Sequence, residues 1–151
     1  MPVKKQLRKA LNGSLYFPTL MTHLNAEDPL ALVLRGHLYV EAVLIKQIEA
    51  VIVDKKAFTC ARLPFPTKIK IAVALGRIDR DDARGFNALN DLRNDFAHNV
   101  ETKLTKQDEE NLYNALSPGQ RKMIKGPRTA ETAFLRRLRF DIIGLIASAA
   151  G

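Results

Sequence analysis

Three long stretches of this chain carry apolar residues every three or four positions, the spacing that places them on one face of an α-helix. These stretches cover residues 30–53, 79–98 and 129–149. We find no stretch in which apolar and polar residues alternate as they do in a half-buried strand, and no internal repeat. The periodicity therefore predicts an all-α fold, a bundle of three long helices with several shorter ones.

Capping signals predict where these helices begin and end. Asp28 and Pro29 have the residue types of an N-cap and a first helical position, so we expect the first long helix to follow them. Gly76 has the residue type of a helix C-cap and should end a shorter helix at residues 67–75. Further signals are Asp79 as the cap of the next helix, Thr105 with Asp108 as a capping arrangement for a helix through Leu116, Ser117-Pro118 as a new turn or short helix, and Gly126-Pro127 as a break.

The overall composition indicates a single globular domain without a membrane anchor. A chain of 151 residues with 46% hydrophobic and 26% charged residues is long enough to bury a core of its own. The one cysteine, Cys60, cannot form an internal disulfide, and no pair of cysteine half-sites for zinc is present. Charged residues interrupt the longest apolar stretch, and the first twenty residues lack the apolar segment of a signal peptide. We therefore expect a cytoplasmic protein.

Positive charge is concentrated at the two ends of the chain. The net charge is +8, and residues 1–26 contain no acid. Residues 1–28 are predicted to include a basic N-terminal arm. Two interpretations stay open: the basic ends bind a nucleic acid, or they form an ordinary solvated surface. For the first, the candidate contact residues are Lys4, Lys5, Arg8, Arg136, Arg137 and Arg139.

Arg93 falls within an apolar stripe. When residues 79–98 are wound at about 100° per residue, Arg93 lies on the same side as Phe86, Leu89, Phe96 and Ala97. A buried guanidinium needs an anion or a ligand, because burying it unpaired costs several kcal/mol. Glu41 is the candidate anion, since it shares a helical stripe with Leu34, Leu38, Leu44, Ile45 and Ile48. We therefore predict that Glu41 and Arg93 lie on facing helices and form an ion pair.

Five residues after Arg93 the same helix carries His98, on a polar stripe with Asn87, Asn90, Asp91 and Asn94. An imidazole can exchange protons near neutral pH, and a guanidinium can hold two phosphate oxygens, so this combination suits cleavage of a phosphodiester without a metal ion or cofactor. The alternative is that the Arg93 pair only fixes helix register and that His98 only interacts with the helix dipole. Two other histidines have simpler interpretations: His37 as a satisfied residue at the edge of the core, and His23 as a surface residue.

Three segments together resemble the HEPN superfamily, and most nearly its branch of mannitol operon repressor proteins. They are residues 36–41, residues 65–78 and residues 89–98, the last being the most specific. The signature of that superfamily is an arginine, four to six residues and then a histidine, with a polar residue directly after the arginine. Here Arg93 is followed by Asn94, and His98 stands after four intervening residues.

The resemblance implies an all-α bundle that forms a homodimer, with two copies of the signature meeting at the interface. Many HEPN proteins are metal-independent endoribonucleases of toxin–antitoxin, defence or RNA-processing systems. By this resemblance Arg93 holds the scissile phosphate, His98 exchanges protons and Asn94 helps to orient the site. Glu41, as the predicted partner of Arg93, and Asn90, on the polar stripe, are expected to support it. The mannitol operon repressor branch implies instead a non-catalytic regulator or adaptor that binds nucleic acid, or a protein such as an antitoxin or another regulator.

Overall fold

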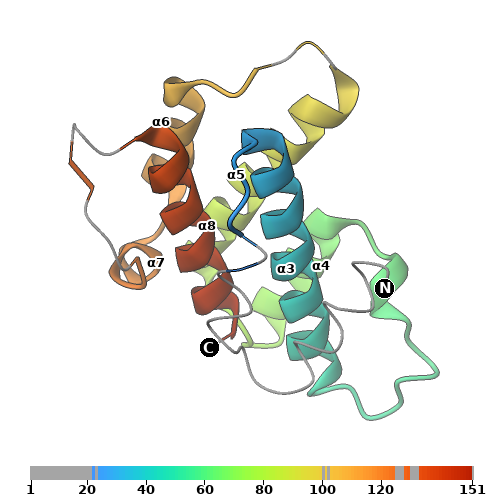
Figure 1. Ribbon diagram of the computed structural model, residues 1–151. Helices are drawn as coiled ribbons and strands as arrows, with labels where there is room; N and C mark the ends of the chain where they lie inside the picture. Colours follow the sequence, from blue (N-terminus) through green and yellow to red (C-terminus); the bar gives the residue numbers. More distant parts are fainter. Residues whose placement is uncertain are drawn as a thin grey trace.

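The computed structural model describes residues 22, 24–99, 101, 103–124, 128–129 and 133–150. These residues form helices and no strands, which confirms the all-α prediction (Figure 1). The α-helices are α3 (Pro29–Glu49), α4 (Phe65–Ala74), α5 (Ala83–His98), α6 (Lys106–Ala115), α7 (Pro118–Lys122) and α8 (Phe134–Ala150), with short 3-10 helices at η1 (Cys60–Arg62) and η2 (Arg80–Asp82).

Helix α3 is the centre of the arrangement. It packs along α8 and also contacts α4 and α5, while α6 and α7 contact α8 from the other side (Figure 1). The two long helices approach closely at Gly36, where a Cβ atom would lie only 2.5 Å from Cγ2 of Ile142. A residue without a side chain is therefore required at this crossing.

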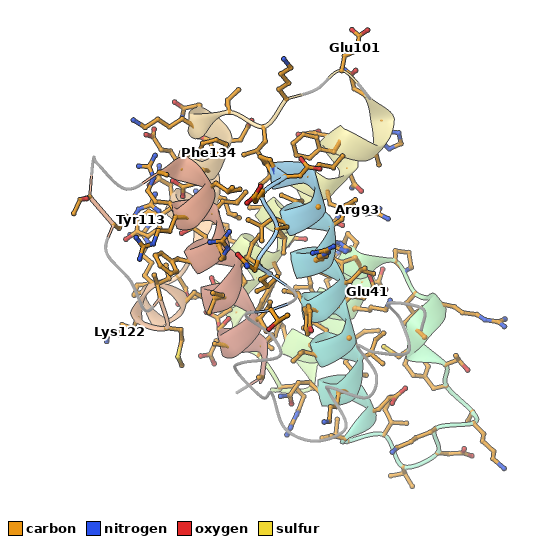
Figure 2. The ribbon with its side chains drawn as sticks, viewed as in Figure 1. Glu41, Arg93, Glu101, Tyr113, Lys122 and Phe134 are labelled. Atoms are coloured by element: carbon orange, nitrogen blue, oxygen red, sulfur yellow. The ribbon has the colours of Figure 1, made fainter. Side chains whose placement is uncertain are left out.

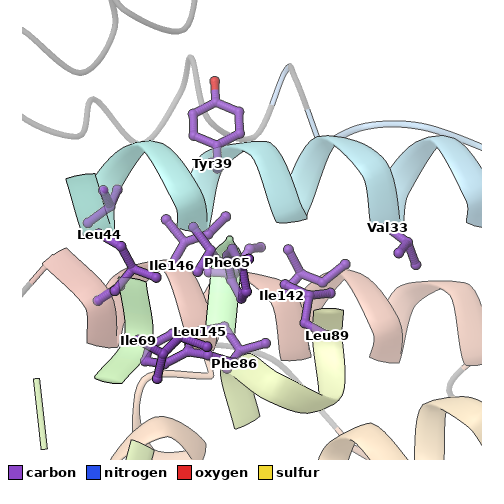
Figure 3. Packing of buried hydrophobic residues seen from close by; sticks show 14 of the residues in the cluster. Val33, Tyr39, Leu44, Phe65, Ile69, Phe86, Leu89, Ile142, Leu145 and Ile146 are labelled. Carbon is purple, nitrogen blue, oxygen red and sulfur yellow. The ribbon is translucent and has the colours of Figure 1, made fainter. Parts of the chain in front are cut away.

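The hydrophobic core lies between α3, α4, α5 and α8 and consists of aliphatic and aromatic side chains (Figure 3). Phe86 and Leu89 of α5 are fully buried, as the stripe on residues 79–98 predicted. In the last helix, the predicted inward residues Leu138, Ile142, Leu145 and Ile146 are fully buried, whereas Phe134 and Leu135 are only half-buried.

The buried face of α3 differs from the one predicted from the sequence. Leu44 and Ile48 are buried as expected, but the core face also includes Val33 and Val40, within about 40° of Leu44 around the helix, and Leu32 further round. The other residues of the predicted stripe lie at the edge of this face: Leu34 is exposed, and Leu38, Glu41 and Ile45 are half-buried. Apolar residues surround much of α3, so periodicity alone could not decide which side meets α8.

Two helix ends also differ from the prediction. Helix α3 ends at Glu49 and not near residue 53, because Val51, Ile52 and Val53 are β-branched residues with low helix propensity. Asp54 then turns the chain by accepting hydrogen bonds from the backbone N–H groups of Lys56 and Ala57 at 3.0 and 3.1 Å. Helix α8 begins at Phe134 and not near residue 129, which lies outside it.

The turn after α4 has the predicted glycine. The helix begins at Phe65, two residues earlier than expected, because Pro66 is tolerated in a first turn, where no intrahelical donor is needed. At the other end Gly76 has a φ of 69°, and its N–H donates to the carbonyl of Val73 while that of Arg77 donates to Ala72. These two hydrogen bonds form a Schellman motif, so the expected C-cap is confirmed.

Of the caps predicted for the later helices, some are observed and one is not. Thr105 and Asp108 form the predicted capping box of α6, and Ser117 forms a second one with Gln120 at the start of α7. Asp79 makes no side-chain capping bond; a short 3-10 helix follows it, and α5 begins at Ala83. The predicted basic segment at residues 3–11, the surface position of His23 and the break at Gly126-Pro127 lie outside the described residues.

Candidate functional site

Arg93, Asn94 and His98 lie on the C-terminal half of α5, where the helix leaves the core. Arg93 and His98 are exposed and Asn94 is half-buried. Nη1 of Arg93 donates to Oδ1 of Asn94 at 3.2 Å, so the amide directly after the arginine orients its guanidinium. His98 is the last residue of the helix. The predicted site is thus an open surface of a single copy of the chain.

The predicted ion pair between Glu41 and Arg93 is wrong. Oε1 of Glu41 accepts a hydrogen bond from Nζ of Lys68 at 2.9 Å, and Arg93 has no carboxylate within ion-pair distance among the residues described. Arg93 lies in the apolar stripe by angle, but its side chain is exposed, although Leu92 is buried and Phe96 packs against the core. The lysine that replaces it as the partner of Glu41 comes from α4.

Sequence reasoning missed Lys68, although a signal for it exists. Lys68 lies between Phe65, Ile69 and Ala72, which follow the helical spacing of a buried face, and its side chain is only 1% exposed. Nζ also donates to the carbonyl oxygen of Ala61 at 3.2 Å. A lysine inside an apolar helical stripe requires an acid, just as was argued for Arg93.

His37 and Asn90 join α3 to α5 next to this pair. Nε2 of His37 and Oδ1 of Asn90 are 2.9 Å apart in a buried hydrogen bond, and the imidazole lies against the Phe65 ring with centroids 4.3 Å apart. Nδ1 of His37 is 3.8 Å from Oε2 of Glu41. The prediction of His37 as a satisfied residue at the core edge is therefore confirmed, and Asn90, predicted to support the site, holds this histidine.

The charges of Glu41, Arg93 and Lys68 all act on His37. Burial lowers the pKa of His37, the bond to Asn90 and the charge of Glu41 oppose that shift, and the cations Arg93 and Lys68 add to it. Arg93 and Glu41 therefore both act on one imidazole, and Figure 2 shows their side chains on the same face of the molecule. We call His37, Glu41, Lys68 and Asn90 the α3–α4–α5 polar cluster.

The predicted nucleic-acid contacts in the last helix are mostly engaged within the chain. Nε of Arg139 donates to the carbonyl of Leu24 at 3.0 Å, and Nη2 donates to that of Ala26 at 3.3 Å. Arg137 is buried, with Nε 3.4 Å from Oε1 of Glu109. The burial of Arg137 argues against its predicted surface contact, whereas Arg139 is half-buried and two of its donors are used by these backbone carbonyls. Arg136 is exposed, with its guanidinium over the Phe140 ring; Lys4, Lys5 and Arg8 lie outside the described residues.

A second charged cluster, not foreseen from the sequence, joins α6 to α8. Arg128 donates to both carboxylate oxygens of Glu109, at 2.9 and 3.0 Å, and to Oδ1 of Asp141 at 3.2 Å. Its guanidinium carbon lies 3.5 Å from the centre of the Tyr113 ring. Burial and the neighbouring Glu109 raise the pKa of Asp141 to about 10. We call Glu109, Arg128, Arg137 and Asp141 the α6–α8 ion cluster.

A hollow of about 530 Å³ lies elsewhere on the molecule. It is lined by η2 with Asp79 before it, by the start of α7 and by Ser148 of α8, whereas Arg93, Asn94 and His98 are not part of its wall. In the described part of the chain no group of three or more His, Cys, Asp or Glu side chains is arranged to hold a metal ion. No helix there is both long enough and apolar enough to cross a bilayer.

Comparisons with protein-family models, with curated proteins and with solved structures find no match to this chain. The geometry of Arg93, Asn94 and His98 and of the neighbouring polar cluster is therefore the basis on which a function is proposed.

Proposed function

We propose that this protein is a HEPN-type, metal-independent endoribonuclease whose site is built from Arg93, Asn94 and His98 of two copies of the chain. The observation that carries the proposal is the exposed Arg93 guanidinium, which is oriented by Asn94 and has no carboxylate partner among the described residues. A permanent cation that is fixed but uncompensated is suited to receive a phosphate.

The helix geometry favours a site shared between two copies. Arg93 and His98 are five residues apart, which corresponds to about 140° around the helix and about 7.5 Å along it. One copy therefore presents the two side chains in different directions, and a second copy can supply the missing one. Leu30 and Leu34 of α3 are 37% and 39% exposed and form an apolar ridge that a second copy can cover.

The proposed chemistry uses the 2′-hydroxyl that only RNA supplies. His98 of one copy accepts the 2′-hydroxyl proton as the oxygen attacks phosphorus, and the bond to the 5′-oxygen breaks. The leaving oxygen takes a proton from His98 of the other copy. Arg93 stabilises the charge that develops on the non-bridging oxygens. The products are a cyclic phosphate end and a free 5′-hydroxyl.

The test is cleavage of mixed single-stranded RNA by the purified protein in the presence of a chelator. Arg93→Ala and His98→Ala should each abolish product formation, and analysis of the ends should reveal cyclic phosphates. Arg84→Ala is a matched control, because Arg84 is also exposed on α5 but lies at its other end. Cleavage that survives both site substitutions would exclude this site as its source.

A second candidate is a non-catalytic regulator or adaptor of the mannitol operon repressor type. It is favoured by the His98 side chain, which has no hydrogen bond that orients it within the described residues, whereas a catalytic imidazole is normally oriented by a further group. This candidate predicts that the protein binds RNA, or a regulatory protein, through the Arg93 face without cutting any strand. The same incubation distinguishes the two, since binding without products supports the regulator.

A further inference from the structure

Lys68 is the most deeply buried cation among the described residues, and both of its hydrogen bonds fix its position. One goes to the carboxylate of Glu41 at 2.9 Å and the other to the Ala61 carbonyl at 3.2 Å. The first joins α4 to α3, and the second ties the ammonium to η1, next to α4. The lysine therefore cannot follow the Glu41 side chain if that chain turns elsewhere.

Glu41 has more freedom than its partner. Its side chain is 29% exposed, and its second oxygen, 3.8 Å from Nδ1 of His37, is beyond hydrogen-bond distance. His37 is already bonded to Asn90 through Nε2. Lys68 is therefore the interaction that fixes the direction of this carboxylate.

A freed Glu41 has another cation within its surroundings. Arg93 and Glu41 act on the same His37 imidazole and lie on the same face of the molecule (Figure 2). A carboxylate paired with Arg93 would occupy the donors that a phosphate needs and would cancel its charge. The net charge presented at this face would fall from one positive charge to zero.

We propose that Lys68 is a positioning residue that holds the Glu41 carboxylate away from Arg93 and thereby keeps Arg93 free to bind a phosphate of RNA. This inference rests on the proposed function for the identity of the ligand. It does not rest on it for the arrangement of charges, which can be measured in the absence of RNA.

The experiment compares Lys68→Met, Glu41→Gln and the double variant with the unsubstituted chain. The first readout is the NMR resonance of the Arg93 Nε–H group, recorded without ligand. We expect this resonance to shift in Lys68→Met, where Glu41 turns to Arg93, and to return in the double variant, where residue 41 is uncharged. Glu41→Gln alone should leave it nearly unchanged, because Lys68 already holds that carboxylate.

The second readout is the affinity of the same variants for a labelled single-stranded RNA oligonucleotide. Lys68→Met should weaken binding about tenfold and reduce the slope of log affinity against log salt by about one, as expected for one lost phosphate contact. The double variant should recover both. Loss of packing at Lys68 alone would not be relieved by a second substitution, so recovery separates positioning from general structural damage.

The outcomes distinguish the inference from the function. A shift that is reversed in the double variant, with no RNA binding by any protein, supports the positioning role and removes the proposed ligand. An Arg93 resonance identical in Lys68→Met and the unsubstituted chain overturns the inference. If Lys68→Met does not fold, a large shift in Glu41→Gln alone also overturns it, because Glu41 would then already engage Arg93. No such shift in Glu41→Gln, together with an Arg93 resonance in the double variant like that of the unsubstituted chain, supports it.

Discussion

The two charged clusters of this molecule use similar residues and reach opposite results. In the α6–α8 ion cluster, two arginines surround Glu109, which is fully buried, and their donors are directed inward. In the α3–α4–α5 polar cluster, Lys68 forms an ion pair with Glu41, and Arg93 remains exposed. Figure 2 shows Tyr113, which marks the first cluster, and Arg93 on different sides of the molecule. In the first cluster the arginines are paired with buried acids, whereas in the second the acid is paired with a lysine and the arginine stays exposed.

The comparison predicts its largest effect at Glu109. Glu109→Gln should lower the free energy of unfolding by about 3–5 kcal/mol, because it leaves the buried Arg137 without its anion and weakens both bonds from Arg128. Chemical denaturation measures this value. Glu110→Gln is the matched control on the same helix, half-buried and without an ion pair among the described residues, and it should change the value by less than about 0.5 kcal/mol. Equal losses in the two variants would contradict the ion cluster.

The α6–α8 ion cluster should also make the stability of the fold depend on pH, through Asp141. Its pKa is raised to about 10 by burial and by Glu109, so the folded chain keeps a proton there that the unfolded chain releases above its ordinary value of 3.8. The stability contributed by this group is complete below about pH 4 and is lost as pH rises toward about 10.

Asp141→Asn removes this dependence while keeping a neutral side chain of the same shape. The free energy of unfolding of the variant, relative to the unsubstituted chain, should therefore rise with pH by up to about 1.4 kcal/mol per unit, or about 3 kcal/mol between pH 6 and pH 8. Denaturation curves at the two pH values measure it. A difference that stays constant or shrinks with pH would show that Asp141 is ionised in the fold.

Lys68→Met should cost less than Glu109→Gln, about 2 kcal/mol in the free energy of unfolding. The charge that it strands belongs to Glu41, which is 29% exposed and can reach water or Arg93, whereas the charge stranded at Arg137 is buried. Lys70→Met on the same helix is the control, since Lys70 is exposed. If Lys68→Met lowered the free energy of unfolding as much as Glu109→Gln, the charges of the two clusters would be equally inaccessible to water.

How far the sequence predicted this arrangement depends on whether the signal was local. The capping box at Thr105 and the C-cap at Gly76 involve residues within a few positions of each other, and both were correctly predicted. The partner of Glu41 depended on which helix lies opposite α3, information that no periodicity contains. The α6–α8 ion cluster required Arg128 to reach residues 19 and 13 positions away, and a helix was predicted to begin at the next residue.

The candidate site was predicted in the same uneven way. The spacing predicted that Arg93, Asn94 and His98 share one helix, and the structure places all three on α5. The exposure of Arg93 could not be inferred, because apolar residues that pack in or against the core, Leu89 and Phe96, lie on both sides of it in the stripe. His37 and Asn90 are 53 residues apart in sequence and lie on different helices, and their contact appears only in the folded chain.

The smallest expected effect is on the stability of the site itself. Arg93→Ala should change the free energy of unfolding by less than about 0.5 kcal/mol, because the guanidinium is exposed and bonds only to its neighbour Asn94 among the described residues. Arg137→Ala, which empties a buried position of the other cluster, should cost several times more. Thermal unfolding of both variants, with RNA binding measured on the same samples, tests the distinction between a cation kept for a ligand and one used for folding. If Arg93→Ala were as unstable as Arg137→Ala, Arg93 would be a structural cation, and the proposal that it binds a phosphate would lose its basis.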